Sequence, residues 1–212
     1  MAEYTLYCFA QSGNAYKAAL MLNLCHADWA PRFVNYFHGE TRTPAYRQIN
    51  EMGEVPMLGH KGMRLCQSGV ILDYLAAQLG QFGPINEDER REILRWLLFD
   101  NHKLTSYTAT LRFMLTFGKT GETPVTEFLR TRSNGALTVL NEWLNTRKFT
   151  VANRPTIADF SMCGYLFWLD EIGVNWNKDY PNIARWLNDI AALLGWVHPY
   201  KLMPGHPLPD QA

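Results

Sequence analysis

The chain has 212 residues, with 20 basic and 20 acidic side chains and a formal net charge of zero. That length suits one large or two small domains with a sizeable core. The charge balance favours neither nucleic acid nor an anionic membrane as a partner. The start lacks a basic segment followed by an apolar one, so we expect no signal peptide. No apolar run approaches the roughly 20 residues that span a bilayer.

The four cysteines are far apart in the sequence and lie in apolar surroundings: Cys8, Cys25, Cys66 and Cys163. Their spacing fits neither a disulfide framework nor a metal site, and the six histidines are scattered. We therefore expect a protein of the reducing cytoplasm that holds no metal.

The first part of the chain predicts a βαβ unit. Residues 3–9 and 31–35 carry the aromatic and β-branched side chains of strands. Residues 15–24 have the composition and apolar spacing of a helix. Ser12 or Asn14 is placed to cap that helix.

A ββα unit follows, after a polar loop with a short helix expected near residues 44–48. Residues 57–59 and 63–66 predict two strands of a hairpin, and a helix then runs to Gly80. The first unit implies a parallel strand pair and the second a hairpin. Together they predict an α/β domain with a four-stranded mixed sheet covered by helices.

Two pairs of residues in this stretch predict a binding site. Val55-Pro56 precedes a strand, and a proline there gives no N–H to a ladder and often hosts a cis peptide. The backbone of Val55 is then left to pair with an extended ligand. Gln67-Ser68 begins a helix, whose unpaired N–H groups and partial positive charge suit a carboxylate. A peptide-like ligand with a free carboxylate fits both features.

The rest of the chain shows only helical patterns. We expect a domain at 1–80, a linker at 81–87 and an all-helical domain at 88–212 with an extended tail from Pro199. A Thr-x-x-Asp pattern resembling a capping box begins one of its helices. The helices are expected at 88–115, 124–143, from Thr156 onwards, and 182–194.

This order of elements and motifs resembles the cytosolic glutathione transferases, in particular the serine-type, bacterial-like members. The resemblance covers nearly the whole chain and implies a thioredoxin-like first domain and a helical second domain. The motifs that carry it are Val55-Pro56, Gln67-Ser68, the turn from Ser12 to Lys17, the box from Thr156 to Asp159, and Tyr180 to Ile183 with Trp186.

The resemblance implies a catalytic hydroxyl in the first turn. Ser12 lies where serine-type members donate a hydrogen bond to the glutathione thiolate, with Asn14 as the rival donor. The alternative role of Ser12 is that of a helix cap. Tyr7 is one position away from the tyrosine-type pattern. Ser12 and Ala15 occupy the spacing of a Cys-x-x-Cys pair without its cysteines, which disfavours dithiol chemistry.

The same resemblance implies the other site residues. Gln67 and Ser68 would hold the γ-glutamyl end of glutathione, and Val55 and Pro56 its backbone. Arg42 would hold the glycine carboxylate, whereas Glu54 stands where the family often has Lys or Gln. The second-substrate pocket would include Asn101, His102 and Tyr107, and Asp100 would reach the glutathione of a neighbouring subunit.

We therefore expect a cytoplasmic, homodimeric glutathione S-transferase that conjugates glutathione, as cosubstrate, to a small electrophile in detoxification. It needs no metal, nucleic acid or membrane. Two alternatives stay open: a non-catalytic glutathione-transferase-like binding or interaction protein, and a glutathione-dependent isomerase or peroxidase.

Overall fold

The structure is a computed structural model, and it describes residues 2–168 and 171–208. The chain forms two compact units. The first runs to Gly83 and takes in the described residues from Leu193 onwards, and the second is Pro84–Ala192. No helix in the described ranges is long and apolar enough to cross a membrane.

One mixed sheet of four strands forms the centre of the first unit, in the order β2-β1-β3-β4. β1 pairs with β2 in parallel and with β3 antiparallel, and β3 pairs antiparallel with β4. The predicted four-stranded mixed sheet is therefore confirmed. The strands are Tyr4–Cys8 (β1), Trp29–Phe33 (β2), Met57–His60 (β3) and Met63–Cys66 (β4).

The second strand begins two residues before the predicted one and includes Pro31 opposite Leu6. A proline is tolerated there because β2 is an edge strand, so the missing N–H interrupts no ladder on its outer side.

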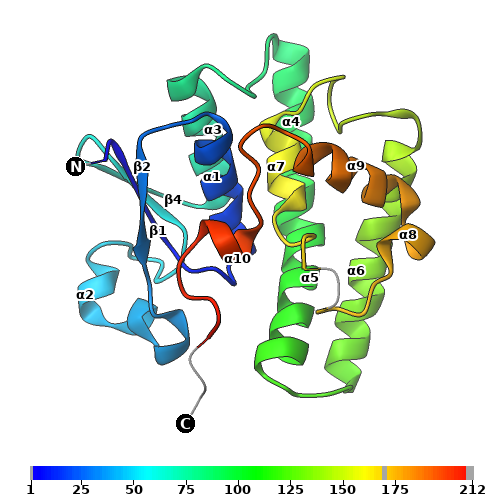
Figure 1. Cartoon of the computed structure of the whole chain (residues 1–212). Coiled ribbons are helices and arrows are strands. Elements are labelled where there is room, and N and C mark those ends of the chain that lie inside the picture. Colours follow the sequence, from blue (N-terminus) through cyan, green and yellow to red (C-terminus); the bar gives the residue numbers. More distant parts are fainter. Residues whose placement is uncertain (1, 169–170, 209–212) are drawn as a thin grey trace. The chain divides into compact units, whose positions relative to one another are not determined.

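Helices α1 (Gly13–Leu24) and α3 (Ser68–Leu79) lie side by side against the sheet (Figure 1). α1 is almost wholly buried, which explains its run of small and apolar residues. Gly80 ends α3 in the left-handed conformation at φ 65°, where a glycine costs least. Three short helical turns link β2 to β3: Tyr36–His38 (η1), Glu40–Arg42 (η2) and Pro44–Arg47 (α2).

The end of the chain differs from the expected extended tail. Pro199–Leu202 forms a short helix, α10, with proline at its first position and His198 Nδ1 accepting from the N–H of Tyr200 at 3.3 Å. The described residues from Leu193 pack with the first unit rather than with the helical unit to which we assigned them. Residues 209–212 of the expected tail lie outside the described ranges.

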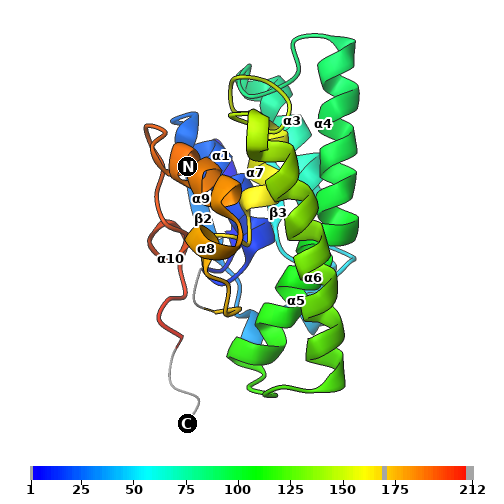
Figure 2. The same cartoon turned by 90° about the vertical axis from the view of Figure 1, so that its right-hand side faces the viewer.

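Every regular element of the second unit is helical in the part of the chain that is described, as the sequence predicts. One continuous helix runs from Glu87 to Phe117 and contains two π-helical stretches, and α6 lies beside its second half (Figure 2). The bounds are Glu87–Phe99 (α4), Asp100–Leu104 (η3, π), Thr105–Arg112 (α5), Phe113–Phe117 (η4, π), Pro124–Trp143 (α6), Leu144–Thr146 (η5), Ile157–Cys163 (α7), Trp176–Asp179 (α8) and Pro181–Ala191 (α9).

Asp159 at the start of α7 is a buried carboxylate that joins three parts of this unit. It accepts from the N–H of Thr150 at 2.9 Å, from the N–H of Thr156 at 2.8 Å and from the indole of Trp186 at 3.0 Å. Burial raises the pKa of this carboxyl, and the hydrogen bonds oppose that rise. The expected Thr-x-x-Asp pairing is thus present, and the same side chain also fixes α9.

We expect Asp159→Ala to lower the free energy of unfolding of the helical unit by about 3–5 kcal/mol, because it leaves several buried donors without an acceptor. Urea titration followed by far-UV circular dichroism measures the change. Asp88→Ala is the control, since the Asp88 side chain is 91% exposed, and it should change the stability far less. Equal losses for the two variants would contradict this role of Asp159.

Candidate functional site

The turn before α1 places Ser12 at the helix N-cap, where the residue is 5% exposed. Its Oγ accepts a hydrogen bond from the N–H of Ala15 at 3.2 Å. A hydroxyl has one hydrogen to donate in addition to its acceptor lone pairs. Ser12 therefore caps the helix and keeps a donor for a ligand.

The start of α3 lies against the start of α1. Ser68 Oγ donates to Asn14 Oδ1 over a long distance of 3.4 Å, across 54 residues of sequence. Gln67 precedes the helix with φ +67°, a conformation that side chains rarely adopt. The structure thus brings Ser12, Asn14, Gln67 and Ser68 to one place, where two helix N-termini present N–H groups and partial positive charge.

The loop before β3 is held by two side-chain hydrogen bonds to its backbone. The carbonyl of Glu54 accepts from the Tyr46 hydroxyl at 2.9 Å and from Asn50 Nδ2 at 2.8 Å. The peptide bond between Val55 and Pro56 is cis. Neither backbone group of Val55 makes a hydrogen bond with any described residue. These groups are available to an extended ligand, as the sequence predicts.

Glu54 faces the candidate site although its side chain is exposed. Its carboxylate accepts from Gln67 Nε2 at 3.1 Å, and the same nitrogen lies 3.1 Å from Met52 Sδ. The acidic side chain of Glu54 therefore accepts a hydrogen bond from Gln67, which is one of the residues expected to bind the carboxylate of a ligand. Met52 did not emerge from the sequence, because a single methionine in a loop carries no motif.

Arg42 ends the η2 turn in the loop between β2 and α2 and is exposed. Its side chain forms no ion pair or hydrogen bond within the described ranges. His38 in the same loop is held by Asn35 Oδ1 at 2.8 Å. Arg42 is thus the loop cation that is available to an anionic group.

Tyr107 is separated from the two residues expected beside it. It lines a groove of about 460 Å³ between the long helix and α6, with its ring edge-on to Phe128 at 6.5 Å between centroids. Asn101 and His102 are exposed and do not line this groove. Its lining residues are Phe99, Lys103, Tyr107, Phe128, Thr131, Arg132, Gly135, Ala136 and Val139.

Asp100 is 1% exposed, so it does not present a carboxylate to the surface. Oδ1 accepts from Thr105 Oγ at 2.6 Å, and Oδ2 accepts from Ser161 Oγ at 2.5 Å. This burial argues against the expected reach to a neighbouring subunit. The reason is tertiary: α7 covers this side of the π-helical turn and supplies Ser161.

The cysteines supply no thiolate to the site. Burial raises the pKa of Cys8 to about 12 and that of Cys25 to about 11. Cys163 is buried, and burial also raises the pKa of Cys66. No group of three or more His, Cys, Asp and Glu residues within 2–168 and 171–208 is placed to hold a metal ion.

Two family models match the chain, and together they cover most of it. Residues 2–77 match the glutathione S-transferase N-terminal domain, and residues 102–193 match the glutathione S-transferase C-terminal domain. The candidate site lies within the first of these matches, and the Tyr107 groove lies within the second apart from Phe99.

A solved structure titled as a possible glutathione S-transferase from Rhodopseudomonas palustris is 31% identical, with a TM-score of 0.87, and the match covers 93% of this chain and 98% of that one. Maleylacetoacetate isomerase from Rhizobium meliloti is 27% identical over 90% of this chain and 86% of its own length. Elongation factor 1-gamma from Danio rerio is 28% identical over 88% of this chain and 43% of its own length. The chain therefore spans less than half the length of the elongation factor.

Proposed function

Because this chain belongs to the glutathione S-transferase family, we propose that it binds glutathione where α1 and α3 begin and conjugates it through its sulfur to a small electrophile. The observation that carries the proposal is the hydrogen bond from Ser68 at the start of α3 to Asn14, two residues after Ser12, together with the unpaired backbone of Val55.

Glutathione matches this arrangement group by group. Its γ-glutamyl carboxylate fits the N–H groups at the start of α3, beside Ser68 and Gln67. Its cysteinyl backbone fits the free N–H and carbonyl of Val55, as an added antiparallel strand would. Its glycine carboxylate suits the cation of Arg42. This placement leaves the sulfur beside the turn that carries Ser12.

The transfer requires an ionised sulfur, because the thiolate is the nucleophile. A free thiol has a pKa near 8.5, and lowering it by about two units needs roughly 2.7 kcal/mol of differential stabilisation. A hydrogen bond to a charged acceptor contributes about 1.5–3 kcal/mol, and a helix N-terminus about 0.3–1 kcal/mol. Ser12 at the start of α1 offers both to the same atom.

A second candidate is glutathione-dependent isomerisation on the same site. The similarity to maleylacetoacetate isomerase extends over most of both chains and favours it. A non-catalytic binding role is the third, favoured by the similarity to elongation factor 1-gamma. Retention on immobilised glutathione, then turnover with a generic aromatic electrophile, separates transfer from the other two. No binding at millimolar glutathione would overturn all glutathione-dependent functions.

The Ser12 hydroxyl should control thiol ionisation. Ser12→Gly removes the hydroxyl while keeping an acceptable N-cap, which costs only a few tenths of a kcal/mol. We expect the pKa of the bound thiol to rise by about one to two units, with kcat/KM at neutral pH falling about 10- to 100-fold. Ultraviolet absorbance of the thiolate against pH measures the shift.

Ser12→Thr should retain most of the ionisation, and Ser106→Ala, an exposed serine on α5, should leave it unchanged. If Asn14→Ala raises the thiol pKa while Ser12→Gly does not, the donor is Asn14 instead.

Glu54 should weaken glutathione binding, because its carboxylate holds Gln67 Nε2 and adds negative charge beside a ligand of net negative charge. We expect Glu54→Gln to lower the Kd for glutathione about two- to fivefold, the range of a surface ion pair, with a smaller effect at high salt. Calorimetric titration measures it, with the exposed Glu51→Gln as control. Weaker binding instead would mean that Glu54 holds the ligand ammonium.

We further infer a homodimer formed through the long helix and α6, within a cytoplasmic detoxification role. The α6 residues along this groove recur at steps of three and four, which is typical of helix packing. Phe128 and Val139 are 53% and 47% exposed, and Leu94 and Leu98 on α4 are 53% and 61% exposed. Exposed apolar side chains on both helices suit an isologous contact with a second copy.

Phe128→Glu should convert the dimer to a monomer, because it places a charge in the centre of that contact. Multi-angle light scattering at micromolar concentration should then give the mass of one chain rather than two. Leu194→Glu is the control, since Leu194 is 84% exposed in the first unit. A wild-type monomer would disprove the dimer, and a Phe128→Glu dimer would disprove this interface.

A further inference from the structure

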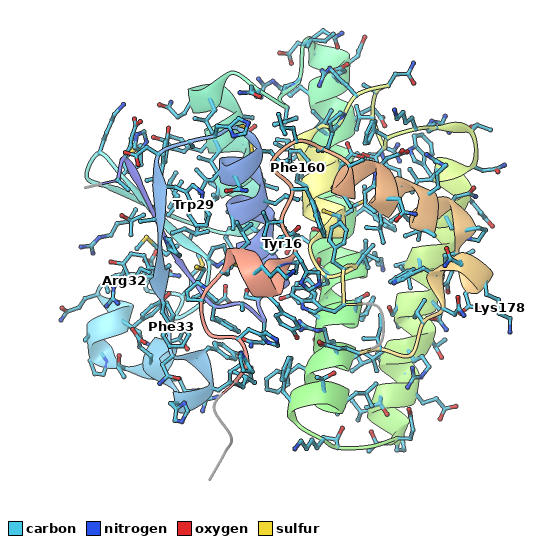
Figure 3. All side chains as sticks on the ribbon, in the orientation of Figure 1. Tyr16, Trp29, Arg32, Phe33, Phe160 and Lys178 are labelled. Atoms are coloured by element: carbon cyan, nitrogen blue, oxygen red, sulfur yellow. The ribbon has the colours of Figure 1, made fainter. Side chains whose placement is uncertain are left out.

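The end of the chain crosses the first unit and is held there by side chains of α1. We call residues 195–206 the C-terminal strap. Asn23 Nδ2 donates to the carbonyl of Gly195 at 2.6 Å, and the Tyr16 hydroxyl donates to the carbonyl of Val197 at 3.0 Å. Tyr16, labelled in Figure 3, is fully buried. These two hydrogen bonds place the strap alongside α1.

The far end of the strap contacts the turn that carries Ser12. The N–H of Ala10 donates to the carbonyl of Pro204 at 2.7 Å. Gln11 is 4% exposed, and its Nε2 donates to the carbonyl of Gly205 at 2.8 Å. The two residues immediately before Ser12 are therefore tied to residues almost 200 positions later in the sequence.

The close approach at this point requires a glycine. Gly205 has φ +93°, and a Cβ atom there would lie 2.5 Å from Cε2 of Phe33 at the end of β2, which Figure 3 labels. The next residue, His206, stacks on Tyr200 at 3.7 Å between ring centroids. This stack joins two residues of the strap itself, so the end of the strap folds back on α10.

We propose that the C-terminal strap is a positioning element for Ser12, which it aligns through Ala10 and Gln11 so that the hydroxyl meets the glutathione sulfur. This inference rests on the proposed glutathione function. Within the turn, the N–H of Ser12 bonds to the carbonyl of Phe9 at 3.0 Å. The same tight turn thus links Ser12 to the two residues that bind the strap, which is the path by which a shift of the strap would reach the hydroxyl.

The strength of the expected effect comes from the geometry of hydrogen bonding. A hydrogen bond to sulfur weakens steeply as its angle departs from linear, and a displacement of about 1 Å in a catalytic group costs about 100-fold in rate in unfavourable cases. Ser12 is held from the helix side by the N–H groups of Ala15 and Tyr16. The turn that leads into it is held from the other side by the strap.

Gly205→Ala tests the proposal, because the added methyl group forces the strap away from Phe33. We expect the pH midpoint of thiolate formation on the protein to rise by about one unit, which is tenfold less thiolate below the midpoint. The KM for glutathione should stay within about twofold, since the strap contacts described above go to α1 and to the turn before it rather than to the Val55 loop or the start of α3.

Gly62→Ala is the matched control. Gly62 also has a positive φ, +81°, lies in the first unit, and has open space where the Cβ would be. The Gly62→Ala variant places a side chain at an unfavourable positive φ without a steric clash, so it should leave the thiolate midpoint unchanged. Adding Phe33→Ala to Gly205→Ala gives the methyl group room and should restore part of the midpoint shift.

A folded Gly205→Ala protein with an unchanged thiolate midpoint would overturn the proposal. Should that variant fail to fold, Gln11→Met removes the donor to Gly205 at similar volume, and an unchanged midpoint there overturns it equally. The strap also has a readout that needs no glutathione. Hydrogen exchange of the amides from Ala10 to Ala15 should speed up in Gly205→Ala and not in Gly62→Ala.

The two proposals fail in different ways. If the wild-type protein binds no glutathione, the proposed function is wrong, whatever the exchange shows. If the wild type ionises bound glutathione but Gly205→Ala changes neither the midpoint nor the amide exchange, only the positioning role is wrong.

Discussion

The convergence of two helix N-termini is the constraint on which the candidate site depends. α1 and α3 pack side by side on the sheet, and Ser68 Oγ meets Asn14 Oδ1 where they begin. Each N-terminus leaves N–H groups without intrahelical partners and a partial positive charge. Two such ends at one place suit an anionic ligand before any charged side chain is considered.

The loop before β3 bears on the orientation that a ligand would take at this site. Tyr46 and Asn50 hold the carbonyl of Glu54, and the backbone of the next residue, Val55, makes no hydrogen bond with any described residue. The carboxylate of Glu54 turns to Gln67 instead. A γ-glutamyl group carries both a carboxylate and an ammonium, and an acid in this place discriminates between the two ends. In the proposed glutathione site, Glu54 therefore affects how the ligand lies as well as how tightly it binds.

Local patterns made the single strands, the Val55-Pro56 loop and the start of α3 predictable, because each depends on neighbours within a few residues. The pairing of the strands followed from the order of the βαβ and ββα units. The burial of Asp100 was not predictable, since it depends on Ser161, 61 residues away. The separation of Tyr107 from the residues before it follows a π-helical turn, which shifts the helix phase without a sequence signal. The strap was not predictable either, because its partners lie at the opposite end of the chain. Its proline-rich sequence also shows no helical or strand period.

The two roles considered for Ser12, helix cap and thiolate donor, do not exclude each other in this geometry. A serine hydroxyl rotates among staggered positions, and a donor that rotates freely stabilises a thiolate poorly. The hydrogen bond from the N–H of Ala15 fixes Oγ at the helix start. One lone pair of the oxygen is then occupied from within the helix, and its hydrogen remains available to donate. In the proposed function the cap makes Ser12 a directed donor, and the helix that it caps adds its positive end beside the same sulfur.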